Sequence, residues 1–402
     1  MTVSIPNSTT SVVEKAPQPF AGLLILELAS VLAGPQVGQF FAELGATVLK
    51  IEAPSGDVTR TWKTASETSE ADISAYFAAS NWGKKSIVLD LTTAHGQEAI
   101  RAFAARADIV LTSYKPGDAE KLGADYATIS AINPRLIYGH LTGYGPATNR
   151  AGYDAVLQAE AGFMYLNGPP GSEPLKMPVA MIDLLAAHQL KEGLLTALYQ
   201  CTHTGRGAYV QVSLLDSALA SLANQAATWL VAGHDPKPLG SGHPGIVPYG
   251  TVYRAADGRQ LVLAVGSDRQ FGLLCEVLAR PEWGVDARFQ TNVLRVANRT
   301  VLEELLRQRI GQVNGDKLLQ TLEKQAVPAG AVRTVGEALQ HASAARMILP
   351  PTADFPHPGL RTVAFQSYTW QCAAALTSPP HLAQHQVETE SLNTGSGQHG
   401  LG

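Results

Sequence analysis

The chain has 402 residues, of which 45% are hydrophobic and 16% are charged, and its formal net charge is −4. This length allows two domains, or one domain with a large insertion, and the apolar content is enough for a sizeable core. The sequence contains no block of Lys and Arg and no apolar run of membrane-spanning length, so we expect neither nucleic acid nor a membrane as a partner.

The first 20 residues are polar and rich in Ser, Thr and Pro. They lack the cationic start and apolar centre of a signal peptide, so we expect a disordered lead-in over residues 1–20 and a cytoplasmic protein. Three cysteines lie far apart and form no CxxC pair, which is typical of reduced thiols: Cys201, Cys275 and Cys372. We expect no metal site, because His381 and His385 follow two prolines and no third ligand is evident.

The first ordered segment is predicted to be a compact βαβ unit. Residues 23–28 are mostly apolar and are typical of a buried strand. Gly34-Pro35 open a helix, since Pro is favoured in the first helical turn, and Gly45 ends that helix as its C′ residue. Residues 46–51 form the next strand.

Strand and helix patterns continue to alternate as far as residue 141. The predicted strands are residues 86–91, 108–113 and 136–141, and the helices between them are residues 71–80, 97–106 and 124–132. Such alternation implies a mostly parallel sheet that is covered by helices on both faces. We therefore predict an α/β fold, with a Rossmann-like open parallel sheet in a large domain and a smaller α/β domain.

Asp183 stands at the junction between an apolar stretch, residues 177–182, and a helix-period segment, residues 184–200. This places it in the N-cap position, where its carboxylate can accept backbone N–H bonds and faces the positive end of the helix dipole. We therefore expect it to stay ionised. An ionised carboxylate held in apolar surroundings is either a structural cap or a nucleophile, and this position alone leaves both interpretations open.

The second half of the chain predicts a smaller domain. A long helix-like stretch runs to about residue 232, and residues 233–250 are rich in Gly and Pro and resemble a loop. Strands are predicted at residues 250–253 and 260–265, a helix at residues 301–312, and an irregular return path beyond Pro328. The expected division is a large Rossmann-like domain at 21–205, a linker helix region at 206–240, a small domain at 241–335 and a return segment to the large domain at 336–402.

Two common functions of α/β proteins lack their motifs here. The first strand-to-helix turn, residues 29–35, contains no G-x-G-x-x-G to approach a dinucleotide pyrophosphate. The sequence also lacks a Walker A motif and the G-x-S-x-G elbow of serine hydrolases. We therefore expect the sheet to bind something other than NAD or a P-loop nucleotide.

Many short strings, in a fixed order, resemble the family III CoA-transferases. The strings are Val31-Leu32-Ala33-Gly34-Pro35, residues 44–52, Gly56-Asp57-Val58-Thr59-Arg60, residues 81–86, Tyr114-Lys115-Pro116-Gly117, Asn133-Pro134-Arg135, Gly143-Tyr144-Gly145, Gly152-Tyr153-Asp154, Asp183, Thr204-Gly205-Arg206-Gly207, His243-Pro244, Pro248-Tyr249 and Pro328-Ala329-Gly330. Each string alone is a weak signal, but together they cover the chain from about residue 20 to 386. The family is also called the CaiB/BaiF type, is formyl-CoA transferase-like, and shares its superfamily with the α-methylacyl-CoA racemases.

The resemblance implies a CoA-transferase that moves CoA from an acyl-CoA to a small carboxylic acid. Asp183 matches the family's nucleophile, which forms an acyl-aspartyl anhydride and then an aspartyl-CoA thioester. Coenzyme A would be a substrate, with no permanently bound cofactor. The resemblance also implies a homodimer whose two subunits interlock.

The resemblance further implies where coenzyme A would bind. The residues that match its phosphate contacts are Lys84, Lys85 and Lys115, those that match the pantetheine pocket are Val31, Ala33 and Tyr144, and those that match a covering lid are Gly240, Gly242 and His243. Each has a plainer interpretation: a solvated lysine, core packing for Val31, and an interdomain linker for the loop. Some members carry Arg where this chain has Ala53, so one adenine-side contact is missing or supplied elsewhere.

Two alternative functions stay open. Racemases of the superfamily use a His in a G-H-D string as one of two bases, whereas this chain has Gly152-Tyr153-Asp154. Tyr, with a pKa of about 10, is a poor base at neutral pH, which favours the transferase and leaves Tyr153 as a packing residue. A non-catalytic acyl-CoA-binding homologue is the other alternative, since a fold alone does not prove activity.

Overall fold

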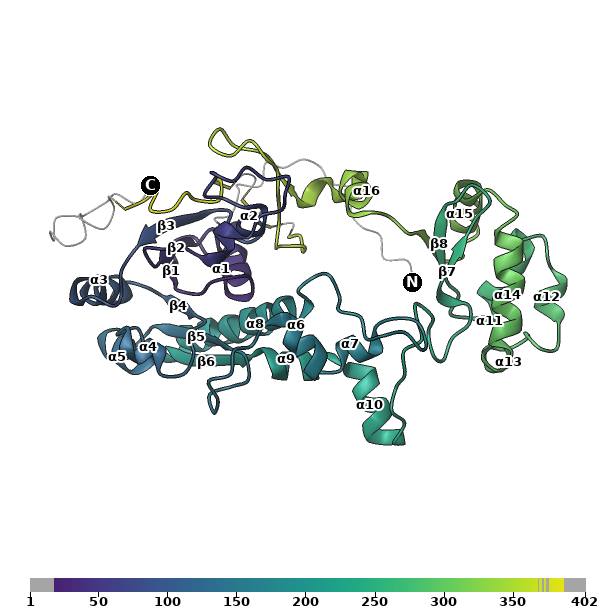
Figure 1. Cartoon of the computed structure of the whole chain (residues 1–402), viewed down its shortest axis with the longest axis horizontal. Coiled ribbons are helices and arrows are strands. Elements are labelled where there is room, and N and C mark those ends of the chain that lie inside the picture. The colour runs from purple at the N-terminus through teal and green to yellow at the C-terminus, as the bar shows by residue number, and fades with distance from the viewer. Residues whose placement is uncertain (1–17, 368, 371, 374–375, 387–402) are drawn as a thin grey trace. The chain divides into compact units, whose positions relative to one another are not determined.

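The computed structural model describes residues 18–367, 369–370, 372–373 and 376–386 (Figure 1). Most of the predicted lead-in, residues 1–17, therefore lies outside the described residues. The chain divides into two compact units: residues 1–157, 180–221 and 345–402 form unit 1, and residues 158–179 and 222–344 form unit 2. No helix within the described ranges is both long and apolar enough to cross a membrane.

Unit 1 is built on a six-stranded sheet in the order β3-β2-β1-β4-β5-β6, and every neighbouring pair is parallel. The strands are β1 Leu24–Glu27, β2 Thr47–Glu52, β3 Lys84–Val88, β4 Ile109–Thr112, β5 Ile137–Thr142 and β6 Ala208–Ser213. The central strand β1 pairs with β2 on one side and β4 on the other, with Ile25 beside Val48 and Ile109. The strand order therefore reverses between β1 and β4, as in doubly wound folds. The predicted α/β class and parallel sheet are confirmed.

Helices cover both faces of this sheet. Their bounds are α1 Ala33–Glu43, α3 Ala94–Ala104, α4 Asp118–Lys121, α5 Tyr126–Ile132, α8 Met181–Thr204 and α9 Leu214–Ser221. Helices α1 and α8 contact each other and the strands on one face. On the other face, Ile100 and Phe103 of α3 and Ile129 of α5 join buried strand residues in one apolar core. Both faces of the strands are thus buried, which explains their nearly continuous apolar sequences.

Three short helices lie in the connections between strands and longer helices of unit 1. They are the 3₁₀ helix η1 Val58–Thr61, α2 Ala75–Ala78 and α6 Asp154–Glu160, the last of which continues into unit 2. The helix predicted at residues 71–80 is only α2, because it begins at the Ser74 cap, whose hydroxyl accepts the Phe77 N–H.

The chain returns to unit 1 after residue 344. A two-stranded antiparallel sheet, β10 Ile348–Leu349 and β11 Gly359–Leu360, precedes a segment that lies against α1 and β3. Thr362 donates its backbone N–H to Glu43 Oε1 at 2.6 Å, and His385 donates its backbone N–H to the Ser86 carbonyl at 3.1 Å. The C-terminal part of the described chain is therefore tied to the edge of the large sheet.

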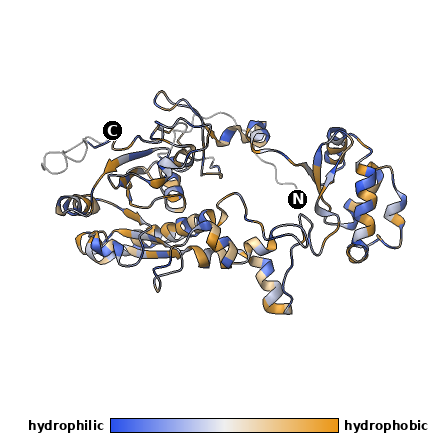
Figure 2. Ribbon diagram, viewed as in Figure 1, coloured by the Kyte–Doolittle hydropathy of each residue, from blue (hydrophilic) through white to orange (hydrophobic). Residues whose placement is uncertain are grey.

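Unit 2 contains a three-stranded antiparallel sheet in the order β7-β8-β9, formed by Tyr249–Arg254, Gln260–Ala264 and Ala329–Ala331. Its helices are α7 Phe163–Leu166, α10 Ala223–Ala232, α11 Asp268–Val277, α12 Glu282–Val285, α13 Asn292–Ala297, α14 Arg299–Ile310, α15 Gly315–Lys324 and α16 Val335–Gln340. The 3₁₀ helix η2 Ala342–Met347 spans the boundary at which the chain returns to unit 1. Helix α14 has an apolar and a polar side (Figure 2), and it buries Leu302, Leu306 and Ile310 in the core.

Two expectations for the second half are corrected. The single long helix predicted up to residue 232 is broken into α9 and α10, because Ala223 has a positive φ of 45° that no helix interior tolerates. The chain beyond Pro328 does not become irregular at once, because Ala329–Ala331 forms β9 and pairs with β8. The short Ala-Gly-Ala sequence of β9 carries no apolar alternation that could have announced a strand.

Candidate active site

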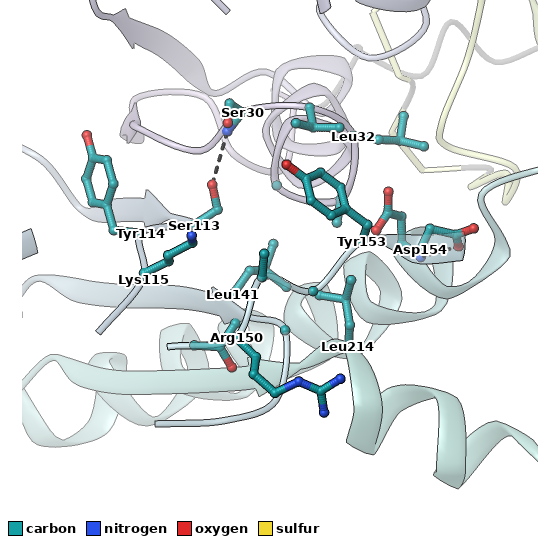
Figure 3. Close-up of a pocket in the computed structure, with 18 of the residues that line it drawn as sticks. Ser30, Leu32, Ser113, Tyr114, Lys115, Leu141, Arg150, Tyr153, Asp154 and Leu214 are labelled. Atoms are coloured by element: carbon teal, nitrogen blue, oxygen red, sulfur yellow. Dashed lines mark hydrogen bonds between the residues drawn. The ribbon is translucent and has the colours of Figure 1, made fainter. Parts of the chain in front are cut away.

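A cavity of about 310 Å³ lies in unit 1 at the carboxyl ends of β1, β4 and β5 (Figure 3). Its wall is formed by the β1–α1 turn, the segment after β4, the end of β5 with the loop that follows it, and the start of α8. This is the place where the strand order reverses, and the two connections that leave β1 and β4 diverge there. Open parallel sheets bind their ligands at such a switch point.

Asp183 lines this cavity from the first turn of α8. It is the third helical residue and not the N-cap, which is Ala180, so the predicted cap position is wrong by three residues. Its side chain is buried, with 8% of the residue exposed. Within the part of the chain that the structure describes, no group donates a hydrogen bond to its carboxylate. The carboxylate is therefore held by its helix and left open toward the cavity.

Burial raises the pKa of Asp183 to about 7, and the negative charge of Asp154 contributes to the rise. A helix N-terminus favours a carboxylate by only about 0.3–1 kcal/mol. The rise of the Asp183 pKa above the ordinary Asp value corresponds to a penalty of about 4 kcal/mol on the ionised carboxylate. The loss of hydration on burial therefore outweighs the stabilisation by the helix N-terminus. The expectation of a fully ionised Asp183 at neutral pH is therefore corrected: the protonated and ionised forms are both populated.

Two glycine-containing strings from the sequence meet beside Asp183. A Cβ atom on Gly152 would lie 2.2 Å from the Cα of Gly143, and one on Gly143 would lie 2.5 Å from the Cα of Gly152. The two backbones are thus in direct contact, which fixes the loop that carries Tyr153 and Asp154 into the cavity wall. Tyr153 is 61% exposed, so it is not the packing residue that the sequence suggested.

Val31 and Ala33 line the same cavity from the β1–α1 turn. Val31 has a φ of +72°, which is strained for a β-branched residue, and strain of this kind often accompanies function. Its backbone N–H donates to Asp57 Oδ2 at 3.3 Å, and Asp57 in turn pairs with the buried Lys50 at 2.9 Å. A buried ion-pair network below the cavity therefore holds the turn in place.

The three predicted phosphate-binding lysines lie in different environments. Lys115 lines the cavity, whereas Lys85 is a half-buried residue of β3 outside it. Lys84 is only 1% exposed and donates to both Glu27 oxygens, to the Pro35 carbonyl and to Asn81 Oδ1, all within 2.9 Å. Burial lowers the pKa of Lys84 to about 8. Its ammonium is fully engaged inside the fold, so we withdraw Lys84 as a phosphate contact.

Sequence reasoning missed two groups at the site. Arg150 lines the cavity, and its guanidinium stacks on the ring of Tyr144 at 4.1 Å, so the predicted Tyr144 joins the site through this contact. Burial raises the pKa of Tyr76 in α2, and the charges of Asp183 and Asp154 raise this pKa further. Tyr76 therefore lies close enough to both acids to be affected by their charges. Arg150 stands two residues before the quoted Gly152-Tyr153-Asp154 string and could have been included with it. Nothing in the sequence around Tyr76 marks it.

The predicted lid residues belong to unit 2. Gly240 donates its N–H to the Gly168 carbonyl at 2.8 Å, and Arg299 donates to the His243 carbonyl at 2.7 Å. A Cβ atom built on Gly242 would lie 3.6 Å from Nη1 of the same Arg299, at an ordinary van der Waals distance. The loop is anchored within its own unit, and its role as a lid stays a prediction. Across residues 18–367 and the other described ranges, no three His, Cys, Asp or Glu side chains could hold a metal ion.

Known proteins resemble this chain over almost its full length. Residues 20–386 match the profile of the CoA-transferase family III. A succinate–glutarate CoA-transferase of Agrobacterium fabrum is 37% identical over 92% of this chain and 94% of its own. A succinyl-CoA:glutarate CoA-transferase of Mus musculus is 33% identical over 92% and 85%, and an acetyl-CoA:oxalate CoA-transferase of Acetobacter aceti is 34% identical over 85% and 88%.

Solved structures give the same result for the fold. The crystal structure of a CaiB/BaiF family protein from Brucella suis superposes with a TM-score of 0.82 at 39% identity, and it covers 94% of this chain and 99% of that one. A hypothetical protein of Mycobacterium tuberculosis, Rv3272, superposes with a TM-score of 0.81 at 28% identity, with 93% and 99% covered.

Proposed function

This chain belongs to the CoA-transferase family III, and from that premise we propose that Asp183 is the nucleophile of its CoA transfer. The observation that carries the proposal is the buried Asp183 carboxylate, which faces a cavity at the switch point of the sheet and accepts no hydrogen bond from the described residues. A structural cap would use its oxygens on backbone N–H groups. Asp183 keeps them available for chemistry.

The first half-reaction transfers the acyl group and then CoA to the enzyme. A carboxylate oxygen of Asp183 attacks the thioester carbonyl carbon, the C–S bond breaks, and an acyl-aspartyl anhydride and a CoA thiolate are formed. The thiolate attacks the aspartyl carbonyl of the anhydride, which releases the donor acid as its carboxylate and leaves an aspartyl-CoA thioester. No net proton is taken up or lost, so the exchange as a whole needs no general acid.

The second half-reaction reverses these steps with a different acid. The acceptor carboxylate attacks the aspartyl-CoA thioester and expels the thiolate, and the thiolate then attacks the acceptor acyl carbon of the new anhydride. The product acyl-CoA leaves and the Asp183 carboxylate is restored. The anhydrides would hydrolyse in contact with water, so the cavity has to be closed during exchange. We propose the loop with Gly240, Gly242 and His243 as that cover.

The raised pKa of Asp183 suits this role. A carboxylate with a pKa of about 7 is more basic, and hence more nucleophilic, than an ordinary aspartate. It is still substantially ionised near neutral pH. A pKa much higher than this would leave too little of the ionised form to react.

We propose that the exchanged acids are small dicarboxylates. The relatives act, by their names, on succinate, glutarate and oxalate. Arg150 contributes a cationic side chain to the cavity wall, and a second carboxylate on the substrate would be stabilised by such a charge. Coenzyme A would bind as substrate along Val31, Ala33 and Tyr144, with Lys85 and Lys115 toward its phosphates.

The remaining parts of the proposal concern the whole protein. We propose a cytoplasmic homodimer with interlocked subunits and no permanently bound cofactor. The five-part division, with boundaries at residues 20, 205, 240 and 335, is likewise proposed as the functional organisation of the chain. Helix α10 supports the dimer, because three apolar side chains in succession are exposed on it: Trp229, Leu230 and Val231.

Replacement of Asp183 tests the nucleophile. Asp183→Ala should abolish CoA exchange between succinyl-CoA and a panel of dicarboxylates, while the melting temperature stays at or above that of the wild type. Hydroxylamine added to wild-type protein with succinyl-CoA should convert Asp183 to its hydroxamate, which peptide mass spectrometry detects. Asp216→Ala is the matched control, because Asp216 is the third residue of α9 and exposed. Exchange by Asp183→Ala at the wild-type rate would refute the assignment.

A further inference from the structure

Helix α8 begins without a cap of its own. Its N-cap residue is Ala180, which has no side-chain acceptor for the exposed N–H groups of the first turn. The missing acceptor is supplied by Asp154, which lies 28 positions earlier in the sequence than Ile182. Asp154 Oδ1 accepts the Ile182 N–H at 2.7 Å and the Asp183 N–H at 3.4 Å. The backbone of Asp183 itself is therefore held by this side chain.

Asp154 is itself held from two sides. It is the first residue of α6, and the Gly143–Gly152 backbone contact fixes the loop just before it. Its side chain lies in the wall of the cavity (Figure 3), which Asp183 also lines. A continuous connection thus runs from the end of β5, through the two glycines and Asp154, to the start of α8.

We propose that Asp154 is a positioning residue for Asp183: its carboxylate ties the first turn of α8 to the cavity loop and holds the nucleophile against the thioester. This inference rests on the proposed function of Asp183. An ordinary cap from a Ser or Asn at position 180 would hold the helix but not the loop. The long-range cap fixes both walls of the cavity relative to each other.

The charge of Asp154 adds a second effect to the cap. A carboxylate beside Asp183 favours the neutral form of Asp183, and the charge of Asp154 follows burial as a cause of its raised pKa. Other titratable or cationic groups near the pair are Tyr76 from α2, Tyr153 from the cavity loop, and Lys115 and Arg150 from the cavity wall. Removal of the Asp154 charge should therefore lower the pKa of Asp183 and leave a less basic nucleophile.

Two substitutions separate the cap from the charge. Asp154→Asn keeps an oxygen that can accept from Ile182 and Asp183 but removes the charge, whereas Asp154→Ala removes both. Asp125 provides matched controls as Asp125→Asn and Asp125→Ala, because its Oδ1 caps α5 by accepting the Thr128 N–H at 3.0 Å and it does not line the cavity. Each variant is measured for melting temperature, kcat, KM and the pH profile of kcat/KM with the acid pair that the wild type exchanges fastest.

We expect Asp154→Asn to melt near the wild type and to move the acidic limb of its pH profile down by about one pH unit or more. Asp154→Ala should lose about ten- to hundredfold in kcat, as expected for a displaced nucleophile, with little change in KM. Its melting temperature should fall no further than that of Asp125→Ala. Both Asp125 variants should keep the wild-type kcat and pH profile.

Wild-type kcat in Asp154→Ala, or an unshifted acidic limb in Asp154→Asn, would overturn the inference. If Asp154→Ala does not fold, the profile of Asp154→Asn decides alone. Asp183→Ala, assayed in parallel, separates the two proposals. An active Asp183→Ala removes the nucleophile and the role of Asp154 together, whereas an inactive Asp183→Ala beside unaffected Asp154 variants refutes only the positioning role.

Discussion

The proton on Asp183 should control the pH dependence of the exchange. Only the ionised carboxylate attacks a thioester, and burial places its pKa at about 7. Activity should therefore be lost as pH falls through about 7, by about tenfold per pH unit below it, and not only below about 4, where an ordinary aspartate becomes protonated. The measurement is kcat/KM from about pH 5 to 9, with the titration of the acid substrates measured separately over the same range. A profile that is flat down to pH 5 would contradict it.

Lys84 and Lys115 should respond differently to substitution by Met. Lys84→Met removes a buried cation from Glu27, which is itself 0% exposed, and should lower the free energy of unfolding by about 3 kcal/mol, since Lys50 still pairs with Glu27. Lys115→Met should change stability by less than about 0.5 kcal/mol but raise KM for acyl-CoA. Urea unfolding and steady-state kinetics measure the two effects. A raised KM with unchanged stability in Lys84→Met would restore the withdrawn phosphate contact.

These residues show what a sequence can and cannot locate. An apolar stretch and a helix pattern, both local signals, located the start of α8 near Asp183, and the family resemblance singled out its carboxylate. Lys84 was misassigned because its partner Glu27 lies 57 positions away, and only the pairing of β1, β2 and β3 brings them together. The raised pKa of Asp183 was missed for a similar reason, because burial and Asp154 come from tertiary packing.

At the scale of the elements, several strands of both the parallel and the antiparallel sheet were predictable. The sequence predicted β1, β2, β4 and β5 to within two residues at each end, because strands buried on both faces are apolar throughout. Strand β3 was displaced, since it begins with the two lysines Lys84 and Lys85. Strand β9 and the break at Ala223 were missed, because a three-residue strand and a single positive φ leave no periodic signal.

The contact between Gly143 and Gly152 gives a test at this scale. Gly152→Ala places a Cβ 2.2 Å from a backbone atom, so the two loops must separate. We expect a loss of about 1–3 kcal/mol in stability and about tenfold or more in exchange rate, because Tyr153 and Asp154 move with the loop. Gly272→Ala in α11 is the control: a Cβ there meets nothing within 4 Å, so stability should rise slightly or stay constant. Full activity in Gly152→Ala would show that the loop tolerates displacement.

At the scale of the whole molecule, unit 2 carries apolar surface that a single chain leaves uncovered. On α10, Trp229 is 55% exposed, Leu230 is 78% exposed and Val231 is 86% exposed. Scattered apolar residues are common on protein surfaces, but three in succession on one helix favour burial against a partner. Since most soluble oligomers are symmetric dimers of identical chains, a second copy is the occupant that we expect.

Light scattering tests this expectation. The wild type should have twice the 42.5 kDa mass of one chain at all dilutions that can be measured. Leu230→Lys combined with Val231→Lys should lower the dimer fraction, because each buried lysine would have to lose its hydration without a partner. Val285→Lys combined with Val293→Lys is the control, since these residues are 74% and 77% exposed on α12 and α13, outside the proposed contact.

If the subunits interlock, differently tagged dimers should also fail to exchange chains until they are unfolded. A monomeric wild type would refute the dimer, and rapid chain exchange would refute the interlocking alone.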